Sequence, residues 1–178
     1  MNSPTNPDGR GYEQLFSDFD SPLMQRVRRE AYGRDIGQHS WILVEELEQY
    51  VPQLLLTSQS RLLDLGCGPC GPLVFIAGLL GCRITGVDLS ANAIAAGQVR
   101  VTSLGMQDSV ELQQRDLNCS LPFERHAFNA VISLDVILHL RDRSRTFLEI
   151  ARLVAPHGRF LFTDAGVLTG PFQTKKCG

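Results

Sequence analysis

No sign of charge dominates this sequence: 17 Lys and Arg residues stand against 19 Asp and Glu residues among 178, which gives a formal net charge of −2. A protein that binds nucleic acid or an acidic membrane through general electrostatics carries a basic excess, so we expect neither as a partner. The sequence also lacks an apolar run near the ~20 residues of a membrane helix, and it opens without a signal-peptide pattern. A cytoplasmic location is therefore the expectation.

Cysteine is too sparse and irregular for a disulfide framework, because the chain has five Cys at uneven spacing. Cys67 and Cys70 form a CxxC pair, for which a zinc or redox role is the alternative to a structural one. No second CxxC or His pair completes a tetrahedral ligand set, so we expect no metal. With 43% apolar and 20% charged residues, the composition is that of a globular domain with its own core.

The chain divides into four segments by local composition. Ser21 followed by Pro22 predicts a helix that ends near Tyr32. A second run of apolar residues at helical spacing predicts another helix from Trp41 to about Val51. The segments are a flexible leader over 1–20, two N-terminal helices with a connecting loop over 21–55, the main domain over 56–166 and an irregular tail over 167–178.

Short apolar runs alternate with helical stretches in the main domain, and this alternation predicts an α/β fold. Parallel strands need crossover connections, so the pattern indicates a Rossmann-like, doubly wound parallel sheet with helices on both faces. Ligands of such sheets bind at the carboxyl ends of the strands. The predicted strands are 61–65, 83–87, 110–112, 130–134 and 159–163, and the predicted helices are 70–80, 91–104 and 143–154.

A glycine-rich loop follows the first predicted strand, where Gly66, Gly68 and Gly71 form a GxGxxG pattern ahead of a helix. Glycines allow a tight turn and let a ligand approach the backbone amides. Asp88 ends the next strand about 20 residues later, where a carboxylate accepts hydrogen bonds from ribose hydroxyls. The loop and the acid together predict a ligand that contains a nucleoside.

Two further acids distinguish this site from a nicotinamide site. Asp64 stands two positions before the first glycine, where an acid repels a pyrophosphate but suits a cationic ligand. Asp116 follows the third strand and can accept a hydrogen bond from an adenine amine, although capping of the following turn is an equal alternative.

In order and spacing, five motifs resemble those of class I S-adenosylmethionine-dependent methyltransferases; they lie at 62–68, 86–90, 115–116, 128–133 and 152–162. The resemblance implies S-adenosyl-L-methionine as the cofactor and the strand order 3-2-1-4-5. It places Asp64, Gly66, Cys67 and Gly68 at the methionyl end, Asp88 at the ribose, Asp116 at the adenine amine, Leu89 and Leu117 on the adenine faces, and Ser133 at the end of the fourth strand.

The stretch from Ala31 to Trp41 resembles the N-terminal segment that small-molecule methyltransferases fold over the cofactor. Two glycines flanked by aromatic residues suit a lid, which moves and also docks apolar surface. The alternative is an ordinary helix connection with Trp41 in the core. We expect Tyr32, Ile36 and Gln38 to be the lid residues that contact the cofactor.

Asp135 and His139 follow the fourth predicted strand, beside the expected position of the methyl group. His is well suited to accept a proton near neutral pH, and this stretch resembles that of phosphoethanolamine methyltransferases, where such a His is the base. We expect His139 to be the base and Asp135 to hold a substrate amine. The alternatives are a His that only lines the pocket and an Asp that caps a turn. The Tyr that those enzymes use upstream has no counterpart in 18–20, which reads Asp-Phe-Asp.

The expected function is transfer of a methyl group from S-adenosylmethionine to a nitrogen, oxygen or carbon atom of a small molecule by in-line displacement. One alternative is a methyltransferase-like binding module that acts through a partner chain; a nicotinamide-dependent oxidoreductase is disfavoured by Asp64. The family's sheet has seven strands and this sequence offers five, which predicts a C-terminally shortened member. Its fifth strand would then be an open apolar edge for self-association.

Overall fold

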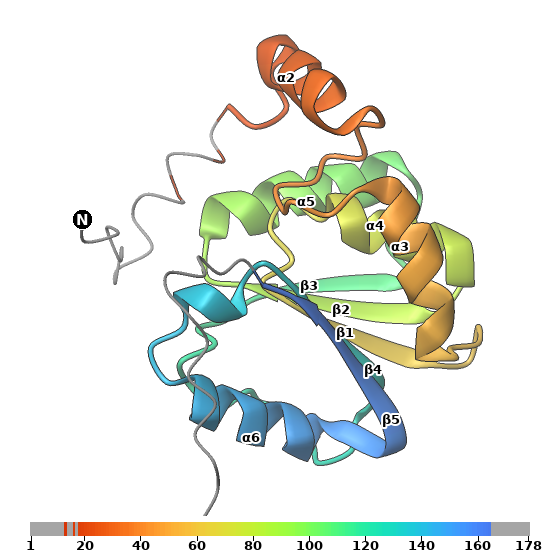
Figure 1. Cartoon of the computed structure of the whole chain (residues 1–178), viewed down its shortest axis with the longest axis vertical. Coiled ribbons are helices and arrows are strands. Elements are labelled where there is room, and N and C mark those ends of the chain that lie inside the picture. Colours follow the sequence, from red (N-terminus) through yellow and green to blue (C-terminus); the bar gives the residue numbers. More distant parts are fainter. Residues whose placement is uncertain (1–12, 14–15, 17, 165–178) are drawn as a thin grey trace, which may run out of the picture.

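The computed structural model of the chain describes residues 13, 16 and 18–164. Its centre is a sheet of five parallel strands in the order β3-β2-β1-β4-β5, which confirms the predicted fold class and strand order (Figure 1). Strand β1, which precedes the glycine loop, lies in the middle of this sheet. The strands are β1 (Arg61–Leu65), β2 (Arg83–Asp88), β3 (Val110–Gln114), β4 (Phe128–Leu134) and β5 (Val154–Thr163).

Helices cover both faces of the sheet within the described chain. Figure 1 shows α3, α4 and α5 on one face and α6 on the other, with α2 beyond the first layer. None of these helices is both long and apolar enough to cross a bilayer. The α-helices are α2 (Pro22–Tyr32), α3 (Val44–Tyr50), α4 (Gly71–Leu80), α5 (Ala91–Ser103) and α6 (Arg143–Leu153), and two 3-10 turns are η1 (Val51–Leu54) and η2 (Ile137–His139).

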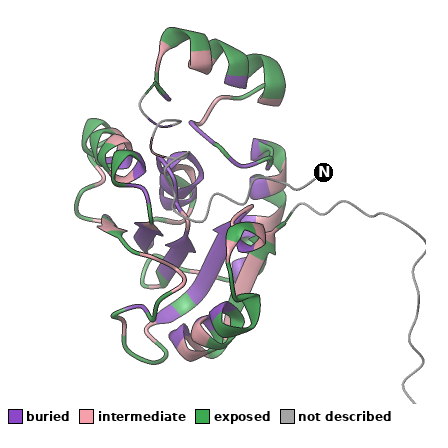
Figure 2. Cartoon of the chain, turned by 90° about the vertical axis from the view of Figure 1, so that its left-hand side faces the viewer, coloured by how far each residue is buried: buried purple, intermediate pink, exposed green. Residues whose placement is uncertain are grey.

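The core has two layers, one on each side of the sheet, and buried residues concentrate along the strands (Figure 2). Adjacent residues of β1 point to opposite faces, as the pleat requires. Leu62 belongs to the layer under α3 and α4, whereas Leu63 belongs to the layer that contains Ile150 and Leu153 of α6. This double burial fixes the carboxyl end of β1, and with it the start of the glycine loop.

The predicted start of the second helix at Trp41 was wrong, because the helix of this stretch, α3, begins at Val44. The backbone N–H of Trp41 donates to Oδ2 of Asp135 at 2.6 Å, which holds this residue out of the helix. The Glu46 side chain accepts from the N–H of Leu43 at 2.8 Å and caps the helix there instead. The Trp41 side chain is 76% exposed, so it is not the core residue of the alternative interpretation.

The fifth strand also begins earlier than predicted, at Val154 rather than at residue 159. Phe128 pairs with Val154, but Ala130 pairs with Arg159, so the register shifts between these two pairs. His157, within the shifted stretch, has a φ of 64°. An irregularity of this kind has no hydrophobic period of its own, and periodicity alone therefore detected only the regular second half of β5.

Candidate cofactor and acceptor site

The glycine loop is tied to the neighbouring strand before any ligand is considered. The N–H groups of Gly66 and Cys67 both donate to the carbonyl of Val87 in β2, at 2.8 and 3.0 Å. Gly66 has a φ of 78° and Gly68 a φ of 53°, a backbone conformation that residues with a side chain rarely adopt. A Cβ on Gly66 would collide with the Val136 side chain. These constraints explain why glycine occupies the turn.

Asp88 joins the loop to the start of α5. Its Oδ2 accepts from the N–H of Gly68 at 2.8 Å, and its Oδ1 accepts from the N–H of Ser90 at 2.9 Å. Burial raises the pKa of this carboxyl, and the backbone hydrogen bonds partly offset that effect. Each carboxylate oxygen can accept more than one hydrogen bond, so the group can also receive a diol from the crevice.

Asp64 is the least satisfied charged group of the site. Its side chain is 3% exposed, and no side chain or amide in the described part of the chain donates a hydrogen bond to its carboxylate. Burial, followed by the nearby charge of Asp88, raises its pKa to about 8. An ammonium group would supply both the hydrogen-bond donor and the positive charge that this buried carboxyl lacks. The residues present therefore fit a cationic cofactor.

The CxxC pair belongs to the fold of the loop. Cys67 and Cys70 are both buried, and the Cys70 thiol donates toward Sγ of Cys67 at 3.8 Å. This hydrogen bond and burial raise the pKa of Cys67 above its ordinary value. A Cβ on Gly86 would lie 2.9 Å from the Cys67 sulfur, so that side chain packs against β2. Cys67 therefore offers its backbone, not its thiol, to the crevice.

The predicted adenine residues lie at the carboxyl ends of β2 and β3. Oδ1 of Asp116 accepts from the N–H and the side-chain amide of Asn118, at 2.8 and 2.9 Å, and its Oδ2 accepts from the Cys119 thiol at 4.0 Å, which is a turn-capping geometry. Leu89 is 42% exposed, so its side chain is accessible to a ligand. Leu117 is partly buried against the core layer that contains α6 residues. Ser133 is fully buried and donates to the carbonyl of Leu65 at 3.3 Å.

Gln38 lies at the centre of the expected lid turn and is 1% exposed. Its Oε1 accepts from the N–H of Ile36 at 2.9 Å, and its amide donates to the carbonyl of Arg34 at 3.0 Å. The amide group of Gln38 is therefore used to shape the turn. Ile36 packs against the core that contains the loop cysteines. Burial and the charge of Asp135 raise the pKa of Tyr32, which places this phenol close to the end of β4.

Asp135 connects the lid to the sheet. Its Oδ2 accepts from the N–H of Trp41 at 2.6 Å, and its Oδ1 accepts from the hydroxyl of Thr163 in β5 at 2.8 Å. Its own φ is 58°. His139 lies four residues further on in η2 and is exposed. Burial lowers the pKa of His139, although the charges of Asp164 and Asp135 act in the opposite direction.

The residues missed by the sequence reasoning come before α2. Phe16 and Phe19 are 6% and 2% exposed, although both fall in the expected leader over 1–20, and their rings lie 5.3 and 6.0 Å from that of His39. The ring of Phe16 approaches the position of a Cβ on Gly68 to 3.9 Å. Residues 1–12, 14–15 and 17 of the expected leader and the tail from 165 lie outside the described residues. The helical spacing of the two Phe residues was the available signal.

Glu13 was missed for a different reason. Its carboxylate accepts from the N–H groups of Ala91 and Asn92, at 2.8 and 3.1 Å, at the first turn of α5. An acid at a helix N-terminus is favourable because it faces the positive end of the helix dipole. This contact joins residues 78 positions apart, so no local sequence pattern predicts it. Glu13 therefore lies at the first turn of α5, beside the Asp88 end of the crevice.

Comparison with known proteins gives a consistent family. The sequence model of the family described as "Methyltransferase domain" matches residues 63–162, more than half of the chain. The glycine/sarcosine/dimethylglycine N-methyltransferase of Actinopolyspora halophila is 33% identical over 109 residues, which are 61% of this chain and 19% of that protein. Phosphoethanolamine N-methyltransferase 1 of Zea mays is 31% identical over 120 residues, 67% of this chain and 23% of that protein.

A solved structure extends the match to the fold. Phosphoethanolamine N-methyltransferase 2 of Haemonchus contortus, in complex with phosphomonomethylethanolamine and S-adenosylhomocysteine, is 25% identical with a TM-score of 0.71. The match covers 89% of this chain and 37% of that chain. The chain spans about a fifth of the length of the two curated relatives. S-adenosylmethionine is the cofactor that these matches indicate.

The first prediction concerns Asp88. Replacement by Ala removes the acceptor for both ribose hydroxyls, so we expect the affinity for S-adenosylhomocysteine to fall by about 1 to 3 kcal/mol, the range for hydrogen bonds to a charged group. Isothermal titration calorimetry measures this directly. Asp108→Asn, an exposed acid before β3, is the matched control and should bind as the unchanged protein does. Equal affinity of the Asp88 variant would remove this residue from the cofactor site.

The second prediction concerns the proton on Asp64. With a pKa of about 8, this carboxyl is largely protonated at pH 7 in the free protein, and a cationic amine can pair with it only after the proton leaves. Binding should therefore release close to one proton at pH 7, and the affinity should fall by up to about tenfold per pH unit below 8. Calorimetry in buffers of different ionisation enthalpy counts that proton. Asp64→Asn should abolish the release, and a zero count in the unchanged protein would contradict the assignment.

Proposed function

Because the chain belongs to the methyltransferase domain family, of the class I S-adenosylmethionine-dependent type, we propose that it transfers a methyl group from S-adenosylmethionine to a small-molecule acceptor. The observation that carries this proposal is the buried, unpartnered carboxyl of Asp64 beside the turn at Gly66 and Gly68, with Asp88 closing the other side. That set offers one site for a cation and one for a diol at the carboxyl ends of β1 and β2.

The chain's own residues mainly bind, orient and exclude water. S-adenosylmethionine supplies a methyl group on a positively charged sulfur, which a nucleophile attacks in line. Asp64 would hold the ammonium group of its methionyl end, and Asp88 would accept from the ribose hydroxyls. The lid turn, closed by Gln38 and joined to Asp135 through Trp41, would keep water from the reacting atoms.

His139 is the residue that we propose as the proton acceptor. It lies in η2, shortly after β4, and it is exposed. Because its pKa is lowered by burial, its imidazole is neutral at pH 7 and can accept a proton from an amine or hydroxyl. Asp135 would position the lid through the hydrogen bonds that its two oxygens accept, and its remaining lone pairs could still hold a substrate amine.

A small amine is the acceptor that this environment favours. The carboxylates of Asp135 and Asp164 act on His139, and both attract a cation. The two curated relatives are named as N-methyltransferases of glycine derivatives and of phosphoethanolamine. A panel of glycine, sarcosine, ethanolamine and phosphoethanolamine, with formation of S-adenosylhomocysteine as the readout, is the experiment that tests the proposed activity. No formation with any acceptor, despite tight cofactor binding, would favour the second candidate below.

The third prediction follows from the role of His139. His139→Ala should slow turnover by about 10²- to 10⁴-fold, the usual contribution of a positioned base, while the affinity for S-adenosylhomocysteine stays nearly unchanged. With S-adenosylmethionine saturating at every pH, the rate of the unchanged protein should fall only below pH 6.5, because the lowered pKa keeps the neutral form present down to that pH. His126→Ala, a histidine at the amino end of β4, is the control. An unaltered rate for His139→Ala would remove it as the base.

A binding module that acts through a second copy of the chain is the other candidate. The observation in its favour is an exposed aromatic cluster over β5 and α6, formed by Phe147, Phe160 and Phe162. Phe147 and Phe162 are 40% and 44% exposed, and β5 is the outermost strand of the described sheet. Apolar sheet edges of this kind pair readily with other chains.

The fourth prediction separates the two candidates. If the edge of β5 is a self-association surface, light scattering after size-exclusion chromatography should show a mass that rises with protein concentration. Phe162→Ser should return the mass to that of one chain, whereas Leu79→Ser, an exposed apolar residue of α4, should not. A single-chain mass at every concentration would contradict the second candidate and leave the methyltransferase activity unaffected.

A further inference from the structure

A cluster of ion pairs above the lid is not used by the proposed reaction. Its centre is Arg28 of α2, whose side chain is only 5% exposed. Its Nε donates to Oδ1 of Asp35 at 2.7 Å, its Nη1 donates to the carbonyl of Phe19 at 2.6 Å, and its guanidinium lies 4.2 Å from the centre of the Phe19 ring. A buried charge persists only when it is paired and hydrogen bonded, so Arg28 commits these partners to one arrangement.

Asp35 passes this constraint to the lid turn. The oxygen that accepts from Arg28 also accepts from the N–H of Gly37 at 2.8 Å. Although burial raises the pKa of Asp35, the hydrogen bonds from Arg28 and Gly37 and the charges of Arg28 and Arg100 lower it overall. Asp35 is therefore ionised at neutral pH and holds the turn at 35–37 to α2.

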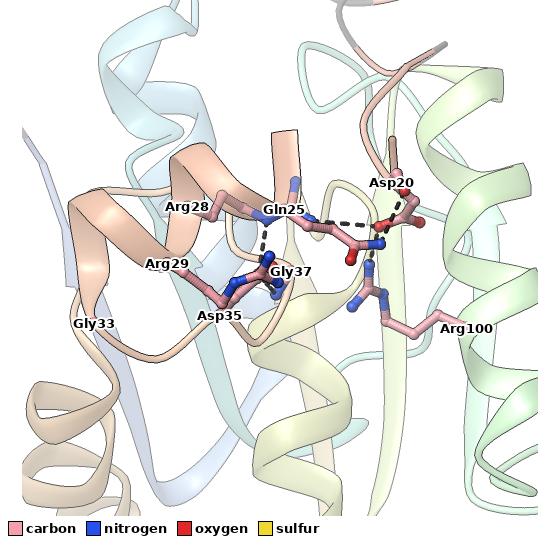
Figure 3. Close-up of a pocket in the computed structure, with 8 residues that line it drawn as sticks. All are labelled: Asp20, Gln25, Arg28, Arg29, Gly33, Asp35, Gly37 and Arg100. Carbon is pink, nitrogen blue, oxygen red and sulfur yellow. Dashed lines mark hydrogen bonds and ion pairs between the residues drawn. The ribbon is translucent and has the colours of Figure 1, made fainter. Parts of the chain in front are cut away.

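Arg100 of α5 holds the same turn from the other side (Figure 3). Its Nη1 donates to the carbonyl of Ile36 at 3.2 Å, and its Nη2 pairs with Oδ1 of Asp20 at 2.7 Å. A Cβ on Gly37 would collide with this guanidinium. On the opposite side, a Cβ on Gly71 would collide with the carbonyl of Gly37. The turn is thus wedged between α5 and the first residue of α4.

That wedge lies next to the cofactor loop, because Gly71 begins α4 three residues after Gly68. Arg100 itself is remote from the crevice: it lies nine residues after Ala91, where α5 begins at the Asp88 end, a separation of roughly 13 Å along a helix. Arg28 is likewise enclosed by Asp35, Phe19 and Asp20. Both arginines therefore face the outer side of the lid.

We propose that Arg28 and Arg100 are positioning residues for the cofactor: they hold the lid turn at 35–37 against the start of α4, and cofactor affinity depends on them without contact. This inference rests on the proposed function, since it assigns these arginines to the lid of the methyltransferase site. A ligand that needs the closed lid binds more weakly in proportion to the fraction of closed protein. Loss of either arginine lowers that fraction.

The test uses Arg100→Ala in the full chain, because removal of the Arg100 side chain leaves no buried unpaired charge: Asp20 is half-exposed and keeps its ion pair with Arg28 at 3.6 Å. We expect S-adenosylhomocysteine to bind about tenfold more weakly by calorimetry, as follows from a tenfold drop in the closed fraction. Hydrogen exchange should be faster in the peptide that contains Gly37, with the strands unchanged. Arg100→Lys should recover only part of the affinity, since one ammonium group cannot reproduce the two-sided contact.

The cluster borders a cavity whose lining includes Arg28, Arg29 and Arg100 (Figure 3). Arg29→Ala is the matched control, because Arg29 lines this cavity and has no ion pair within the described chain. It should bind S-adenosylhomocysteine as the unchanged protein does. A purely structural role of Arg100 would instead lower the melting temperature and speed exchange throughout the sheet. Arg28→Gln is the second variant, and Asp20→Asn replaces it if Arg28→Gln does not fold.

The outcomes are distinct from failure of the proposed function. If the unchanged protein binds S-adenosylhomocysteine and Arg100→Ala binds it equally well, the positioning role is overturned. If the unchanged protein does not bind at all, the proposed function fails, and the exchange measurement alone decides the lid contact. Exchange near Gly37 that is equal in Arg100→Ala and the unchanged protein would then overturn the inference, and faster exchange confined to that peptide supports it.

Discussion

Two carboxyl groups at one glycine turn, Asp64 buried and Asp88 partly buried, set the conditions for everything else at the crevice. Asp88 is stabilised by two backbone N–H groups, which belong to Gly68 and Ser90. Asp64 receives no such donor, and its burial next to Asp88 makes ionisation costly. An acid held in this state gains most from a cation that arrives with its own diol. The cofactor's ammonium group would therefore supply the charge that Asp64 lacks, while its ribose hydroxyls would donate to Asp88.

The described N-terminal residues are joined to the rest of the fold by individual polar contacts: Trp41 to Asp135, Glu13 to the start of α5, and the arginines to Asp35 and Asp20. Charged contacts of this kind have a defined geometry and can break and reform, unlike an apolar core. Contacts that break and re-form suit the lid that we propose, because it must open to admit a ligand.

The strands and the glycine loop could be predicted because each depends on local sequence, whereas the strand order followed from the resemblance to class I methyltransferases. Short apolar runs mark β1 and β2, and Gly66 and Gly68 mark a turn whose backbone conformation residues with a side chain rarely adopt. Contacts between distant residues could not be predicted. Trp41 meets Asp135 across 94 residues, and Arg100 meets Asp20 across 80, so no periodic pattern records either pair. The same is true of the register shift in β5, and of the early start of that strand.

The assignment of Asp64 and Asp88 is tested most directly by a crystal structure of the chain grown with S-adenosylhomocysteine. The account predicts the ligand's amino group within hydrogen-bond distance of the Asp64 carboxylate and its ribose hydroxyls on Asp88, beneath the turn at 35–37. A ligand bound elsewhere, or a crevice filled by the side chain of Phe16 with the ligand excluded, would contradict it.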